Sequence, residues 1–198
     1  MKSIFLAMLL VATLPAVSAT WDIDDAHTTA KFKIRHLMVS NVYGQITGAK
    51  GSLEMDEKDP TKTTGTVTLD VSTVNTANEK RDAHLKGEDF FDVAKNPSIT
   101  YTIKKVTKGK AGKYKMDGEL TMKGVTKSVS LNDVEITPTV KDPWGGIRRG
   151  FSGTTTLNRK EYGLTWNKQL DGGGMVVGDT VEIEVAAELK EKPAAAKN

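Results

Sequence analysis

The sequence has 198 residues, a length that fits one domain. It contains no cysteine, which excludes disulfides, cysteine metal sites and thiol nucleophiles. The formal net charge of +3 is small and the charged residues are interspersed, so nothing in the composition indicates binding to nucleic acid.

The first 19 residues have the layout of a secretory signal peptide. Lys2 gives a positive start, residues 4–11 form an unbroken apolar run, and Val17-Ser18-Ala19 supplies the small residues that a signal peptidase recognises. The apolar run is much shorter than the ~20 residues that span a bilayer. We therefore predict cleavage after Ala19 and a periplasmic or secreted protein without a transmembrane anchor. Retention of the segment as an uncut anchor is the alternative.

Alternation of apolar and polar residues dominates the rest of the chain and predicts β-strands. It is clearest over 181–189, where Val181, Ile183 and Val185 alternate with acidic residues. Successive side chains of a strand point to opposite faces, so each such segment has one dry face and one wet face. Further strands are expected over 30–38, 44–56, 66–72, 99–104, 113–122, 125–136 and 147–157. About eight strands with turn signals between them favour an all-β, eight-stranded antiparallel barrel.

Three segments lack this alternation. Residues 78–92 place Arg81 and Leu85 at helical spacing, which predicts a short helix and loop inserted between two strands. Residues 168–179 contain three consecutive glycines and are expected to form a flexible loop. The last residues, 191–198, are expected to be a disordered tail, so the predicted domain covers 20–190.

The interior of an eight-stranded barrel is wide enough to be filled by side chains or to hold one slender ligand. Glycines in several strands either bend the barrel or leave space beside the backbone, so both interpretations stay open. Burial of a long apolar chain would be favourable by ~25 cal/mol per Å² and would need neither a metal nor a catalytic group. The alternation selects these candidate lining residues: Phe32, Ile34, Val71, Tyr101 and Phe151.

The most concentrated polar cluster lies in the predicted helical insert and contains Arg81, Asp82, His84 and Leu85. We interpret it as a cap on the barrel mouth that meets the polar head of a ligand, because a guanidinium can grip a diphosphate or quinone oxygen with several donors. The alternative is an internal Arg–Asp tie that holds the insert in place. Phe91 follows this cluster and is expected to anchor the insert, with a ligand contact as a second role.

The few histidines give little support for a metal site or for catalysis. No pair of them has ligand spacing with a carboxylate partner. His36 lies on the apolar face of its strand, where one internal hydrogen bond is favoured over a ligand contact, although it stays a candidate. No nucleophile elbow is present. We predict a binding protein rather than an enzyme, without a metal or other cofactor.

Short stretches in a specific order resemble the YceI-like family, a periplasmic polyisoprenoid-binding family with a lipocalin-like barrel. The resemblance covers residues 21–189. It implies an eight-stranded barrel with a helix near residues 81–91, an elongated apolar tunnel that holds a polyisoprenoid chain, and a homodimer. The stretches that carry it include Phe32-Lys33-Ile34-Arg35-His36, Arg81-Asp82-Ala83-His84-Leu85, Asp89-Phe90-Phe91-Asp92, Asn96-Pro97-Ser98-Ile99-Thr100-Tyr101 and Asn158-Arg159-Lys160-Glu161-Tyr162-Gly163-Leu164.

The leading hypothesis is a carrier or sequestering protein of the bacterial envelope that holds a quinone or polyprenyl lipid. One alternative is an envelope interaction or stress protein whose barrel is filled by its own side chains. The other is an enzyme acting on a prenyl diphosphate, for which Asp82 with His84 is the local acid–base candidate.

Overall fold

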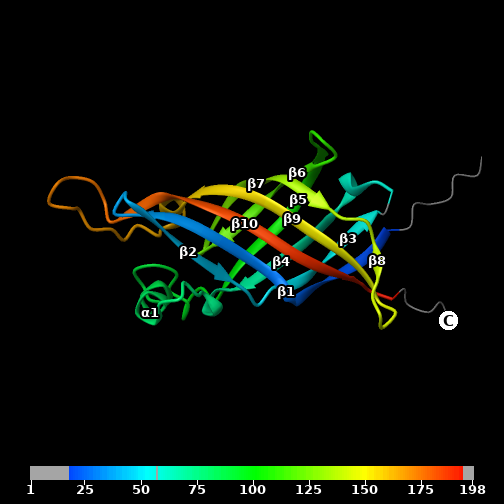
Figure 1. Ribbon diagram of the computed structural model, residues 1–198, viewed down its shortest axis with the longest axis horizontal. Coiled ribbons are helices and arrows are strands. Elements are labelled where there is room, and N and C mark those ends of the chain that lie inside the picture. Colours follow the sequence, from blue (N-terminus) through cyan, green and yellow to red (C-terminus); the bar gives the residue numbers. More distant parts are fainter. Residues whose placement is uncertain (1–17, 57, 194–198) are drawn as a thin grey trace, which may run out of the picture.

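The alternating segments form the strands of a closed barrel in the computed structural model, which describes residues 18–56 and 58–193 (Figure 1). Pairing between β9 and β10 closes the ring, which confirms the predicted eight-stranded antiparallel barrel. Around the ring the strands are β10 (Val177–Glu191), β1 (Ser18–His36), β3 (Lys50–Asp56), β4 (Thr64–Asp70), β5 (Ser98–Lys108), β6 (Tyr114–Met122), β7 (Val125–Ile136) and β9 (Ile147–Asn158).

Two shorter strands lie beside the ring. β2 (Ser40–Ile46) forms a hairpin with the second half of β1, and β8 (Val140–Lys141) pairs with β9. The single strand predicted over 44–56 is wrong, because β2 ends at Ile46 and β3 begins at Lys50. Gly48 accounts for the break: its φ of 69° leaves the extended region, and a Cβ there would lie 2.7 Å from Asp70 Cβ.

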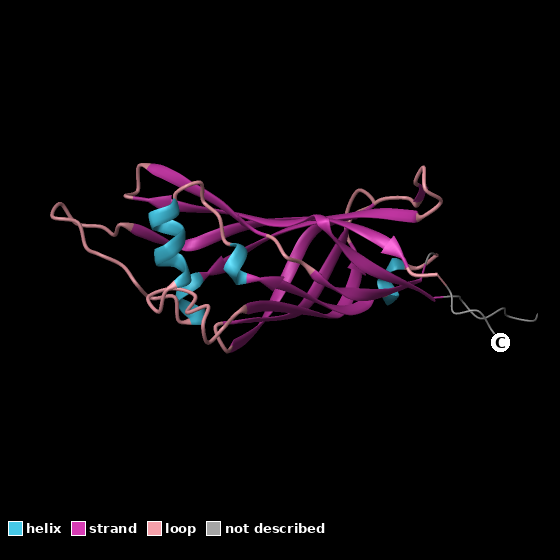
Figure 2. Cartoon of the chain, turned by 90° about the horizontal axis from the view of Figure 1, so that it is seen from below, coloured by secondary structure: helices cyan, strands magenta, loops and turns pink. Residues whose placement is uncertain are grey.

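The insert between β4 and β5 contains α1 (Glu79–Lys86), which confirms the predicted short helix. The side chain of Asn78 caps the helix by accepting a hydrogen bond from the Arg81 amide at 3.0 Å. Short 3₁₀ turns lie at η1 (Pro60–Lys62), η2 (Val71–Thr73) and η3 (Arg159–Tyr162). Figure 2 shows α1 across one end of the barrel, opposite the end from which the described chain enters and leaves.

Two clusters of buried side chains occupy the two ends of the barrel. At the end where β1 begins and β10 ends, Trp21, Met55, Val134 and Leu189 are each 0% exposed and close the interior. We call this the sealed end. At the α1 end, a second cluster packs the insert and the turn after β9 against the strands; its buried members are Phe90, Met122, Leu157, Tyr162 and Leu164. Burying a large apolar side chain stabilises the fold by roughly 1.5–3 kcal/mol, so both ends contribute to stability.

The first and last described strands meet at the sealed end. Ser18 and Ala19, the last two residues of the predicted signal peptide, pair with β3, while residues 1–17 lie outside the described part of the chain. β10 runs to Glu191, one residue into the segment predicted to be a tail, and the Lys192 amide donates to the Thr20 carbonyl at 2.8 Å. No helix among the described residues is long and apolar enough to cross a membrane.

Candidate functional site

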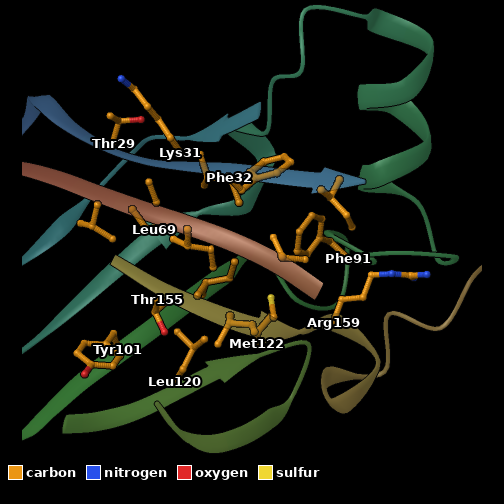
Figure 3. Close-up of a pocket in the computed structure, with 18 of the residues that line it drawn as sticks. Thr29, Lys31, Phe32, Leu69, Phe91, Tyr101, Leu120, Met122, Thr155 and Arg159 are labelled. Atoms are coloured by element: carbon orange, nitrogen blue, oxygen red, sulfur yellow. The ribbon is translucent and has the colours of Figure 1, made fainter. Parts of the chain in front are cut away.

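A cavity of about 570 Å³ occupies the barrel interior between the two buried clusters. Its wall is apolar, and every strand of the ring contributes to it. Figure 3 shows Leu69 from β4, Met122 from β6 and Phe91 from the insert approaching this space from different sides. Because period-2 alternation points every second side chain inward, the same pattern that builds the strands also makes the wall apolar. Pockets of this size and composition are typical of sites for apolar small molecules.

The inward side chain of Tyr101 shows how one polar group is accommodated in this wall. Gly118 makes room for the Tyr101 ring, since a Cβ at that position would lie 2.5 Å from the ring carbon Cζ. The hydroxyl group donates to the backbone carbonyls of Met116 (2.9 Å) and Val129 (3.1 Å). Burial raises the pKa of Tyr101, which keeps the phenol neutral. The part of the Tyr101 side chain that faces the cavity is therefore its apolar ring.

Most of the residues singled out from the sequence line this cavity. Val71 is buried in η2 rather than in the wall, because β4 ends at Asp70, whose side chain accepts from the Ser72 amide at 2.8 Å and turns the chain. Asp82 also lies away from the wall. The residues that do line it are Phe32, Ile34, His36, Arg81, His84, Leu85, Phe91, Tyr101 and Phe151.

Arg81 and Asp82 both bind Thr76, at the start of the insert. The Arg81 guanidinium donates from Nε to Thr76 Oγ1 (2.7 Å) and from Nη2 to the Thr76 carbonyl (2.8 Å). The Asp82 carboxylate accepts from the Thr76 amide (2.9 Å) and from its hydroxyl. These bonds form a clasp centred on a residue that is 6% exposed. The tie predicted for the insert therefore runs through Thr76, with Arg81 also facing the cavity.

His84 belongs to an aromatic group at the α1 end of the cavity. Its ring makes edge contacts with Phe90 and Trp166, with centroid separations of 5.0 and 4.9 Å. Its Nε2 lies 2.8 Å from Asp89 Oδ2, so Asp89 and not Asp82 is the carboxylate beside His84. Periodicity does not identify Trp166 as a site residue, because Trp166 lies in a loop.

Arg159 is a second residue of the site that the alternation did not select. It is 3% exposed, lines the cavity, and donates to the carbonyls of Gly178 (2.8 Å) and Trp166 (2.9 Å), and also to that of Leu164. Burial lowers the pKa of Arg159, and the carbonyl partners offset part of the cost of burying its charge. Arg159 thereby fixes the turn after β9 to the start of β10. Its inward position, two residues after Leu157, continues the alternation and could have identified it.

The charged residues around the cavity have one sign. Among the described residues that line it there is no Asp or Glu, whereas the basic residues are Lys31, Arg35, Lys80, Arg81 and Arg159. Figure 3 shows the Lys31 ammonium group pointing away from the cavity. Lys80 and Arg81 lie on α1 and contribute positive charge at this end of the cavity, which favours a ligand head with electron-rich oxygens there.

A separate polar cluster lies on the outside of the sealed end. Asp24, His27 and Glu188 bring possible ligand atoms within 4.8 Å of one another, but Arg148 Nη1 lies 2.7 Å from Asp24 Oδ2 and 3.0 Å from Glu188 Oε1. Lys190 Nζ also lies 2.8 Å from Asp24 Oδ2. Burial would raise the pKa of Asp24, but its bonds to Lys190, His27 and Arg148 outweigh this and lower it to about 2. The cluster is thus an ion-pair network.

Comparison with known proteins gives consistent results. Residues 21–189 match the family model of the YceI-like domain. The UPF0312 protein SA2479 of Staphylococcus aureus strain N315 is 39% identical over 167 residues, which cover 84% of this chain and 94% of the relative. The crystal structure of the Campylobacter jejuni YCEI protein has a TM-score of 0.66 and 29% identity, covering 97% of this chain and 99% of that one. A polyisoprenoid-binding domain from Saccharophagus degradans has a TM-score of 0.60 and 13% identity, covering 88% and 99%.

Proposed function

Since the chain belongs to the YceI-like family, we propose that its barrel binds a long-chain isoprenoid lipid of the quinone or polyprenyl type. In this proposal it acts as a carrier or sequestering protein of the bacterial envelope, reached through the predicted signal peptide. The observation that carries the proposal is the cavity of about 570 Å³, with an apolar wall from all strands of the ring. The Saccharophagus degradans neighbour, which shares the fold, is named for polyisoprenoid binding, and we extend that ligand class to this chain.

The apolar tail would enter from the α1 end and lie along the wall, because the Trp21 cluster closes the other end. Its binding free energy would come from apolar area removed from water, at ~25 cal/mol per Å². The polar head would stay near Arg81 and His84, where Lys80 adds positive charge. This arrangement needs no metal or reacting group: the wall holds the tail and the cations orient the head.

We propose binding rather than catalysis. Of the described residues at the α1 end, His84 with Asp89 is the acid–base pair closest to the proposed head position, and no carboxylate faces the cavity itself. The wild-type protein is expected to release no phosphate from geranylgeranyl diphosphate, as measured with a colorimetric phosphate assay. Phosphate release that disappears in His84→Gln would instead favour the enzyme hypothesis.

The experiment that tests the proposal is mass spectrometry of protein purified from its native envelope. The intact complex under gentle conditions is compared with solvent-extracted material, and one isoprenoid lipid per chain is expected. The same spectra report whether the mature chain begins at Thr20 and whether it is a homodimer. A protein that carries no lipid and takes up neither added quinone nor prenyl diphosphate would contradict the proposal and favour an interaction protein.

A further inference from the structure

Exposed apolar side chains gather at one end of the molecule. Among the described residues, five of the seven large hydrophobic side chains that are exposed lie on the β1–β2 hairpin or the loop before β10. The Leu37 amide donates to the Val176 carbonyl at 2.8 Å, so these two segments are neighbours. Figure 1 shows both projecting at the left, beyond the barrel. We call the following residues the apolar tip: Leu37 (37% exposed), Met38 (58%), Val39 (77%), Tyr43 (65%) and Met175 (43%).

The hairpin turn holds these residues in an unfavourable backbone conformation. Leu37 and Met38 have φ values of 51° and 60°, and the Val39 amide donates to the His36 carbonyl at 3.1 Å across the turn. Tight hairpin turns with positive φ at both central positions strongly favour Asn-Gly, because a side chain with a Cβ is disfavoured there. Two large apolar residues therefore occupy positions where folding alone favours small or polar ones. Such a mismatch points to a role outside the fold.

The apolar tip adjoins the cavity. His36 and Arg35, directly before the turn, line the cavity, as does Val176, directly after Met175. The Arg35 guanidinium lies at the base of the turn, where Nη2 donates to the Met38 carbonyl at 2.7 Å. Exposed apolar side chains on a convex tip, with a cation at their base, are suited to shallow insertion into the interface of a lipid bilayer. A stable protein interface would instead require a broad complementary surface of about 1,000 Å² or more.

We propose that the apolar tip inserts into the surface of a lipid bilayer and so holds the adjoining end of the cavity against the membrane. Leu37, Met38 and Val39 would enter the region between headgroups and acyl chains, with Tyr43 at the level of the headgroups, where amphipathic aromatic rings are favoured. Membrane docking goes beyond the proposed function and concerns a different surface. Only its purpose, the passage of a lipid tail between bilayer and barrel without exposure to water, rests on the proposed function.

The test compares the same substitution at the two ends of the barrel. Val39→Asp changes the apolar tip, and Val140→Asp changes a valine that is 61% exposed on β8, at the opposite end in Figure 1. Binding is measured by co-flotation with vesicles of phosphatidylethanolamine and phosphatidylglycerol. We expect Val39→Asp to weaken vesicle binding by about tenfold or more, because a valine that inserts is replaced by a charge. Val140→Asp should bind like the wild type.

A second variant separates a loss of vesicle binding from a loss of stability. Leu37→Asn combined with Met38→Gly should leave resistance to urea unchanged or raised, since it relieves the turn, and should still weaken vesicle binding by about tenfold or more. The proposal would be overturned if the wild type and Val39→Asp bound vesicles equally well. It would also be overturned if Val140→Asp weakened vesicle binding as much as Val39→Asp does. Wild-type protein that stays unbound to vesicles would also overturn it and would favour a protein partner for the tip.

Ligand uptake is measured separately, without vesicles. Decylubiquinone should quench the tryptophan fluorescence, to which Trp166 in the cavity wall contributes, equally in the wild type and in Val39→Asp. Loss of vesicle binding with unchanged quenching assigns the defect to docking. Vesicle binding by a wild type that takes up no lipid would contradict the proposed function and leave membrane docking in place.

Discussion

The two ends of the barrel use apolar residues in opposite ways. At the sealed end, Trp21 and Met55 are fully buried and Arg148 ties Asp24 and Glu188 together on the outside. At the α1 end, many inward side chains face a cavity, and the insert is held by the cluster around Phe90 together with the clasp on Thr76. The difference indicates that a barrel packed closely at one end can leave part of its apolar wall unpacked beside a cavity toward the other end.

The largest expected effect comes from removing the centre of the sealed end. Trp21→Ala should lower the free energy of unfolding by about 4 kcal/mol, because it deletes a fully buried ring that also lies 5.3 Å from the Arg149 guanidinium. Ile183→Ala, in the cavity wall, should cost less than about 2 kcal/mol, since space already exists beside it. Urea unfolding followed by circular dichroism measures both. Equal losses would contradict the contrast between the two ends.

The ion-pair network at the sealed end predicts a specific acid sensitivity. The pKa of Asp24 is about 2 in the folded protein, against 3.8 ordinarily, so its carboxylate contributes about 2 kcal/mol of stability above pH 4. This contribution is lost as the pH falls from about 4 to about 2, where the unfolded chain takes up the proton first. Asp24→Asn should therefore be less stable than the wild type at pH 7 by about 2 kcal/mol and lose less stability over that window.

The control for this variant is Asp25→Asn, a substitution at the exposed neighbouring residue. Its stability at pH 7 should stay within about 0.5 kcal/mol of the wild type. Urea titrations at pH 5, 4, 3 and 2.5 give the comparison. An Asp24→Asn protein that follows the wild-type acid profile would show that the network adds no stability of its own.

The smallest expected effect tests how far the cavity extends toward the sealed end. Ala187 lines the cavity on β10, two residues before the buried Leu189. Ala187→Trp should therefore shorten the cavity next to the sealed end. Affinity for a long polyprenyl chain should fall about tenfold, or about 1.4 kcal/mol, while a farnesyl chain binds as before. Fluorescence titration with both chain lengths checks this. Equal loss for both lengths would indicate damage to the α1 end instead.

Much of the fold could be predicted from the sequence because its signal is local. Residues 125–136 form β7 with the predicted bounds, and β6 and β9 differ from prediction by one residue at one end. β1 begins at Ser18 instead of residue 30, because its register shifts between Asp24 and Thr29 and this irregularity hides the alternation. The interruption at Gly48 depends on contact with Asp70, which is distant in sequence.

The candidate site was less predictable, because its polar contacts depend on how the insert and the turn after β9 fold, and alternation carries no information on either. The wall residues follow from alternation, yet the same alternation fits a filled barrel and a hollow one. The partners of Arg81 and His84 are set by how the insert folds back, which places Thr76 and Asp89 beside them. Trp166 reaches the cavity from a loop whose position is fixed by Arg159. The ligand-contact roles of these residues remain predictions.

The bond between the Lys192 amide and the Thr20 carbonyl has a practical consequence for handling the protein. The two residues lie near the start of β1 and just after the end of β10, and Figure 1 shows these strand ends together at the sealed end. A dye, a chip linker or a fused reporter attached beside either residue would therefore be far from α1 and from the β1–β2 hairpin. Molecules immobilised in this way on a sensor surface would all present α1 and the β1–β2 hairpin to the solution.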